Sequence, residues 1–231
     1  MAPQLFGKEH ILYLIISTVL AGAALLLAKR FAKSEKSQRI FILTLAGLLF
    51  VSIVTNRLSQ VFRYGTVRWY CIIPDSFCGM TSFVLSLGVL LGKKDNNVVH
   101  ATWLLGLFGG ISTAIYATFV DQDISFFYLP TISGLIHHSV SATLVVGLFM
   151  FGQLHITIKK WYCHLFGFTA YMTVGAFLMH TFPISDAMHI AEPLLPGSPL
   201  TAWVMAPMYA VGYGLLMLAV ELVRAKKKVT V

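Results

Sequence analysis

Seven long apolar segments, separated by polar connections, dominate the sequence. They lie at about residues 10–28, 40–58, 74–92, 98–120, 131–152, 163–182 and 200–223. A helix that crosses a bilayer needs about 20 mostly apolar residues, whereas a strand of a membrane barrel needs only about 9–11. Because lipid offers the backbone no hydrogen-bond partners, segments of this length must be helical. The sequence therefore predicts an all-α, polytopic membrane protein with one domain, residues 1–231, of seven transmembrane helices.

The composition agrees with this class of protein. Charged residues make up 11% of the chain and hydrophobic residues 57%, whereas a soluble domain has about 25% charged residues. The net charge of +8 does not indicate a nucleic-acid partner, because such proteins present their basic residues on a soluble domain. The opening MAPQLFGKEH lacks the basic region and cleavage site of a signal peptide, so we expect the first segment to be retained.

The distribution of Lys and Arg predicts the orientation of the helices, because cytoplasmic loops are enriched in these residues. With the N-terminus outside, thirteen of the seventeen basic residues fall in inner connections, within residues 29–39, 93–94, 159–160 and 224–228. An even number of spans would break this alternation. We therefore predict an outer N-terminus and a cytoplasmic C-terminus, in the cell membrane if the chain is bacterial.

Polar side chains gather near the outer ends of several predicted helices. Ionisable residues within a membrane are costly and usually face a cavity or a partner, so this layer is the candidate functional site. Its members are Asn56, Arg57, Asp75, Cys78, His137, His138 and His180.

Local spacing refines the expected positions of these residues. Pro74 and Pro130 each suit the first turn of a helix. On the third helix, one stripe is expected to hold Asp75, Cys78, Ser82 and Ser86, which recur at spacings of three and four. Neighbouring side chains on a helix are about 100° apart, so we expect His137 and His138 to point in different directions. Which of the two faces the site is left open.

The glycines and cysteines carry further predictions. Gly106 and Gly110, in GLFGG, have the spacing that allows helices to pack closely. Cys71, Cys78 and Cys163 are too few and too scattered for a disulfide framework, although a bridge between the first two stays an alternative.

A thiol and an imidazole at one depth suggest nucleophilic chemistry. A cysteine needs a nearby base, and a helix N-terminus favours its thiolate. Cys78 would take an acyl group from a lipid ester as a thioester while a histidine transfers the proton, and Arg57 would hold the lipid phosphate. The alternatives are that Cys78 is simply a small buried hydrophobe, and that Asn56 and Arg57 are interfacial anchors.

Five stretches, taken together, resemble the YwaF-like family of integral membrane proteins, which includes a vertebrate cysteine-dependent phospholipid acyltransferase. They read, in order, FGKEHILYLII, NRLSQVFRYG, IPDSFCGM, WLLGLFGGISTAIY and GLIHHSV, and the likeness covers roughly residues 6–155. The resemblance implies a membrane-embedded acyltransferase site with membrane lipid as substrate and no cofactor. Cys78 matches the family nucleophile, His138 matches the histidine better than His137 does, and His180 matches more loosely. Asp75, where the family has an apolar residue, and the last third of the chain depart from the pattern.

Asn56, Arg57, Asp75 and His137 are then candidate substrate-binding residues, and no metal is expected. Two other functions stay open. One is a non-catalytic protein that binds or transports a lipid or small molecule in the outer polar layer. The other is a zinc-dependent membrane hydrolase, for which His138, His180 and His189 are the candidate ligands. The sequence does not indicate an oligomeric state.

Overall fold

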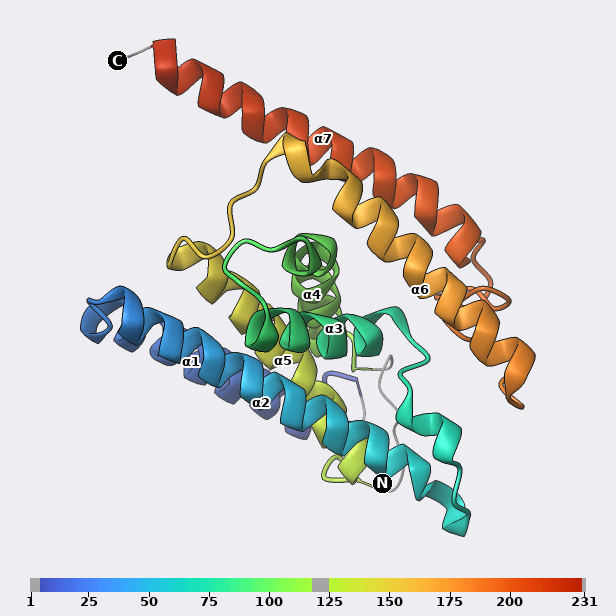
Figure 1. The fold of residues 1–231 in the computed structure, drawn as a ribbon. Helices are drawn as coiled ribbons and strands as arrows, with labels where there is room; N and C mark the ends of the chain where they lie inside the picture. Colours follow the sequence, from blue (N-terminus) through green and yellow to red (C-terminus); the bar gives the residue numbers. More distant parts are fainter. Residues whose placement is uncertain (1–4, 118–124, 230–231) are drawn as a thin grey trace.

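The computed structural model describes residues 5–117 and 125–229, and in these residues every regular element is helical (Figure 1). The α-helices are α1 Lys8–Phe31, α2 Glu35–Val61, α3 Phe77–Leu91, α4 Asn97–Ile115, α5 Leu129–Met150, α6 Trp161–Thr181 and α7 Ala202–Val229. Short 3-10 helices are η1 Arg63–Gly65, η2 Trp69–Ile72 and η4 Ile158–Lys160. Each of the seven predicted segments is a helix. Six of them are long and apolar enough to span a membrane, whereas α3 has 15 residues.

Several predicted boundaries differ from the structure: α2 begins earlier, at Glu35, α7 ends later, at Val229, and two further differences lie close to the candidate site. The third helix begins at Phe77 rather than at Pro74, because the Ser76 side chain caps it by accepting the Gly79 N–H. Pro74 therefore lies in the segment before the helix. The fourth helix ends at Ile115 and not near residue 120, and residues 118–120 lie outside the described part of the chain. Pro130 is the second residue of α5, as predicted for a proline in a first helical turn.

The short helix α3 lies at the centre of the bundle and packs against α2 and α4 (Figure 1). Fully buried leucines from α2, α3 and α5, namely Leu49, Leu85 and Leu144, belong to the main core. α6 packs against α4, α7 lies along α6, and α1 contacts α5. Because neighbouring helices surround α3, a helix too short to span a bilayer by itself is held inside the protein.

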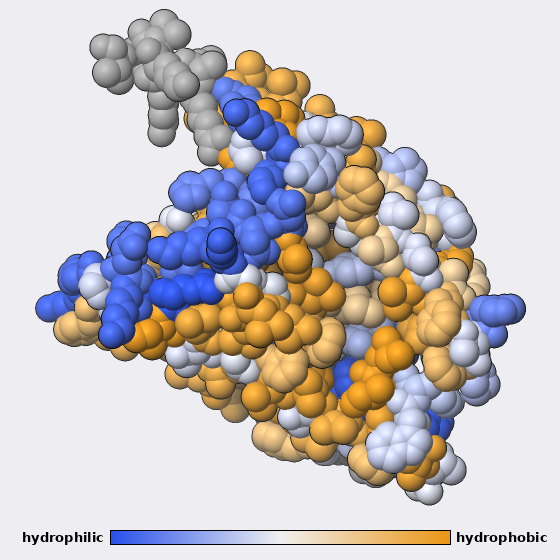
Figure 2. Space-filling model, viewed as in Figure 1, coloured by the Kyte–Doolittle hydropathy of each residue, from blue (hydrophilic) through white to orange (hydrophobic). Residues whose placement is uncertain are grey.

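Three of the predicted cytoplasmic connections meet at one end of the bundle, which we call the basic end. Arg39 donates hydrogen bonds to Gln153 Oε1 and to the carbonyls of Val89 and Gly92. Lys94 forms an ion pair with Glu35. Figure 2 shows the hydrophilic residues concentrated at this end, near the α1–α2 turn, on a surface that is otherwise largely apolar.

The predicted outer connections meet at the opposite end, which we call the Cys78 end. There Arg57 forms an ion pair with Asp75, and the Asp75 carbonyl accepts the Met188 N–H from the α6–α7 connection. His10, near the start of α1, bonds the Ala114 carbonyl near the end of α4. Successive helix ends therefore alternate between two faces, as expected for helices that each cross the same layer. Which face is cytoplasmic stays a prediction.

Candidate functional site

Cys78 is the second residue of α3, and its side chain is half-buried against α4. Thr113 of α4 lies within interaction range of its sulfur. All three cysteines are free thiols, so the alternative of a Cys71–Cys78 bridge is wrong. The start of α3 therefore presents a free thiol to the middle of the bundle.

Gly109 of α4 allows the thiol to approach this closely. A Cβ atom added at Gly109 would lie 2.8 Å from Cys78 Sγ, a distance that real Cβ atoms essentially never show. The His138 imidazole of α5 lies within interaction range of the Gly109 backbone carbonyl. Cys78 and His138 thus meet at the same residue of α4.

His137, the neighbour of His138 on α5, contacts α3. Its Nδ1 lies 3.1 Å from Oγ of Ser82, one turn along α3 from Cys78. The ring centroids of His137 and His138 are 4.2 Å apart, and both side chains are buried. Although the rings lie close together, His137 contacts Ser82 of α3 whereas His138 lies near Gly109 of α4, so the two imidazoles have partners on different helices.

The predicted substrate-binding residues at the helix ends are engaged within the protein. Asn56 Nδ2 donates to the Pro130 carbonyl and to Ser133 Oγ. Arg57 donates through Nε to the Cys71 carbonyl and through an Nη to Asp75, with an N–O distance of 3.0 Å. Asp75 precedes the cap of α3, so it lies outside the helical stripe in which we expected it. The contacts of these side chains tie α2 to α5 and to the segment between α2 and α3.

His180 lies in the last turn of α6 and is exposed, so it is not part of the buried group around Gly109. His189 lies in the α6–α7 connection, 3.8 Å from Asp186. Across residues 5–117 and 125–229, no three His, Cys, Asp or Glu side chains converge as metal ligands would. The three histidines considered for zinc are therefore not brought together.

Four contributors to this region were absent from the sequence prediction: Thr81, Gly109, Thr113 and Tyr171. GLFGG had indicated close packing, and Gly110 does lie against the α5 backbone, where a Cβ would come within 2.6 Å of the His138 carbonyl oxygen. The glycine that faces the thiol is its neighbour, Gly109. Thr81 and Tyr171 have no distinguishing sequence signal, since both occur within ordinary apolar segments.

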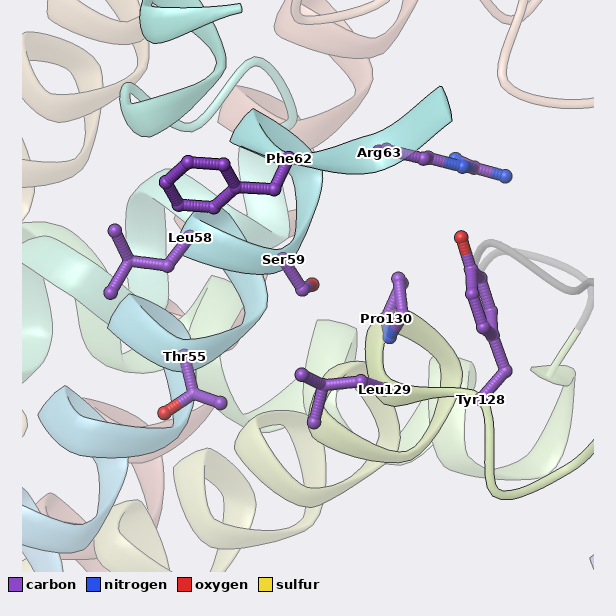
Figure 3. A pocket seen from close by; sticks show the side chains of 8 residues that line it. All are labelled: Thr55, Leu58, Ser59, Phe62, Arg63, Tyr128, Leu129 and Pro130. Carbon is purple, nitrogen blue, oxygen red and sulfur yellow. The ribbon is translucent and has the colours of Figure 1, made fainter. Parts of the chain in front are cut away.

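An open groove of about 510 Å³ lies at the Cys78 end, between the end of α2 and the start of α5 (Figure 3). Its lining is mostly apolar, with Arg63 and Tyr128 on one side, and the Arg63 guanidinium lies 5.8 Å from the Tyr128 ring centre. The lining residues are Thr55, Leu58, Ser59, Phe62, Arg63, Tyr128, Leu129 and Pro130. The groove is therefore separate from Cys78.

Comparison with known proteins gives one match. No curated protein and no solved structure matches the chain. The family model described as "TMEM164 family" matches residues 5–223, which include every helix up to the last part of α7. The YwaF-like relationship and its acyltransferase activity stay predictions. The chain is an integral, multi-pass membrane protein that belongs to the TMEM164 family.

Proposed function

We propose that this protein is a membrane-embedded acyltransferase that moves an acyl chain from a phospholipid to an acceptor hydroxyl through a thioester on Cys78. The observation that carries the proposal is the meeting of the Cys78 sulfur and the His138 ring at Gly109. A thiol nucleophile needs a positioned base, and that base must be oriented by a third group. Here the Gly109 carbonyl orients the imidazole.

In this proposal, the Gly109 carbonyl decides the roles of the two His138 ring nitrogens. The nitrogen nearer that carbonyl carries the proton and donates it in a hydrogen bond, which leaves the other nitrogen as the base. That nitrogen accepts the thiol proton while the sulfur attacks the carbonyl carbon of the lipid ester. The ester C–O bond then breaks, and His138 returns the proton to the departing lysolipid oxygen.

The second half of the reaction reverses these roles. An acceptor hydroxyl attacks the thioester carbonyl and gives its proton to His138. The C–S bond breaks, a new ester C–O bond forms, and the proton returns to the Cys78 sulfur. No oxidant, reductant or nucleotide is consumed, so an exchange of acyl chains between lipids needs only groups that the chain and the membrane supply.

Reconstitution tests the proposal. The purified protein is placed in vesicles of phosphatidylcholine and phosphatidylethanolamine. Only the phosphatidylcholine carries deuterated oleoyl chains. We expect a hydroxylamine-sensitive mass increase on Cys78 and transfer of the label between lipids. Cys78→Ala should abolish both signals, whereas Cys163→Ala, which removes a buried thiol near the basic end, should retain them.

Label transfer that continues at the wild-type rate in Cys78→Ala would overturn the proposal. Wild-type protein that binds the lipids but forms no thioester and transfers no label would overturn it as well, and would favour a binding protein.

A further inference from the structure

Two hydroxyl groups beside Cys78 are buried without regular hydrogen bonds. Tyr171 of α6 is 4% exposed and Thr81 of α3 is 0% exposed. Within the part of the chain that the structure describes, neither the phenol oxygen nor Thr81 Oγ1 makes a hydrogen bond of normal geometry. Buried polar groups in proteins nearly always have partners, so an exception requires an explanation. Among the described residues, the structure gives neither hydroxyl the regular partner that such burial ordinarily requires.

Their positions on the helices place both hydroxyls next to the thiol. Thr81 follows Cys78 by three residues, so the two side chains are neighbours on one face of α3. The Tyr171 ring packs beside Phe77, with ring centroids 6.3 Å apart, and its phenol faces Thr81 and lies within electrostatic range of Cys78. The ring therefore lies against the first turn of α3, the turn that carries Cys78.

The two sides of Cys78 differ in their chemistry. On the α5 side, Ser82 contacts His137, and His138 lies at Gly109. On the α6 side are the hydroxyls of Thr81 and Tyr171. A group bound at the sulfur would thus meet proton-transfer residues on one side and hydrogen-bond donors on the other.

We propose that Tyr171 and Thr81 form the binding site for the carbonyl oxygen of the acyl ester. This inference rests on the proposed function. When the Cys78 sulfur bonds to the carbonyl carbon, the C=O π electrons move to the oxygen, which becomes negatively charged. The two hydroxyls donate hydrogen bonds to that oxygen without giving up their protons, and the charge returns to form C=O when the lysolipid oxygen leaves. Such preorganised donors stabilise acyl-transfer transition states.

The test uses Tyr171→Phe and Thr81→Val, which remove the hydroxyls and keep most of the packing. Matched controls are Tyr209→Phe, whose hydroxyl bonds His164, and Thr102→Val, whose hydroxyl bonds a carbonyl of its own helix. Single-turnover formation of the Cys78 thioester is measured in the same labelled vesicles. We expect Tyr171→Phe to slow it by about 10²–10³-fold, in the range for loss of one oxyanion donor, and the controls to change it by less than about threefold.

Alkylation of Cys78 by iodoacetamide separates this role from a structural one, because that reaction needs the thiolate but develops no oxyanion. We expect Tyr171→Phe and Thr81→Val to be alkylated at the wild-type rate although they acylate slowly. If these variants lose as much rate in alkylation as in thioester formation, the inference is overturned, because the substitutions would then have disturbed the Cys78 thiol itself.

Wild-type rates of thioester formation in both variants would also overturn it and leave the proposed function intact. If the wild-type protein itself forms no thioester, the proposed function fails, and the inference fails with it. The two failures are therefore distinguishable.

Discussion

The two ends of the bundle each combine a cysteine in the first turn of a helix with buried histidines, but only one end assembles them. At the Cys78 end, Cys78 and His138 meet at Gly109. At the basic end, Cys163 is the third residue of α6 and is followed by His164, with His100 nearby on α4. By residue type alone the two groups are equivalent.

The two groups differ in the partners of their histidines. His100 Nε2 lies 2.9 Å from Asp95, and His164 Nδ1 lies 2.9 Å from the Tyr209 hydroxyl. Cys163 interacts with Lys160 and Tyr162 rather than meeting an imidazole. Cys78, by contrast, lies against Gly109, which has no side chain, so the sulfur can approach the backbone of α4 closely. A cysteine and a histidine at the same depth therefore do not define a site, and the close approach that glycine permits is what separates the two ends.

Replacing one histidine at each end gives the largest expected difference. His138→Gln should slow formation of the Cys78 thioester by about 10²–10⁴-fold, because general acid–base catalysis contributes about that much. His164→Gln, at the basic end, should leave the rate within about twofold. Mass spectrometry of the thioester in single-turnover reactions measures both. Equal effects of the two variants would remove the functional distinction between the ends.

A smaller loss in the rate of thioester formation is expected when Gly109 is given a side chain. In Gly109→Ala the new Cβ would lie 2.8 Å from the Cys78 sulfur, so the thiol must move. Displacement of a reacting atom by about 1 Å can cost about 10²-fold, and we expect thioester formation to fall by about 10–100-fold. Gly22→Ala is the control, because a Cβ there meets nothing within 4 Å. An unchanged rate in Gly109→Ala would show that the close approach is not needed.

The ion pairs at the two ends should differ in stability. Arg57 has 10% of its side chain exposed, and its removal leaves Asp75 without this partner. We expect Arg57→Ala to destabilise the protein by roughly 1–3 kcal/mol, less than a fully buried pair because Asp75 is partly exposed. At the basic end, Lys94→Ala breaks an exposed pair with Glu35 and should cost about 0–1 kcal/mol. Unfolding in detergent measures both changes, and a larger loss in Lys94→Ala would contradict this assignment.

The smallest effect concerns Cys71, in η2 between the spans. Burial raises the pKa of this thiol above its ordinary value, more than Arg68 and Arg57 lower it. The folded protein therefore keeps the proton at pH values where an unfolded cysteine would lose it, and alkylation of Cys71 should accelerate only at higher pH. The rate is measured against pH in Cys78→Ala/Cys163→Ala, which leaves this single thiol. A profile that coincides with that of the chain unfolded in SDS would contradict the shift.

Much of the fold could be predicted from one-dimensional features. Apolar length predicted a helix in each of seven segments, and the alternation of basic connections predicted which helix ends share a face. The same reasoning placed Cys78 beside histidines at one end. The predicted start of α3 at Pro74 was wrong, because the Ser76 cap decides where that helix begins.

The sequence by itself determined the class of protein, the number of helices and the end of the bundle at which most of the polar residues lie, because these depend on length, hydropathy and charge along the chain. Only the tertiary structure decided which side chains meet: that Gly109 faces Cys78, that His137 contacts Ser82 of α3, that Arg57 pairs with Asp75, and that Tyr171 of α6 packs against Phe77. Helices that are apolar on all sides do not reveal how each is rotated about its axis. That rotation follows from side-chain packing between helices, which no single segment of the sequence contains.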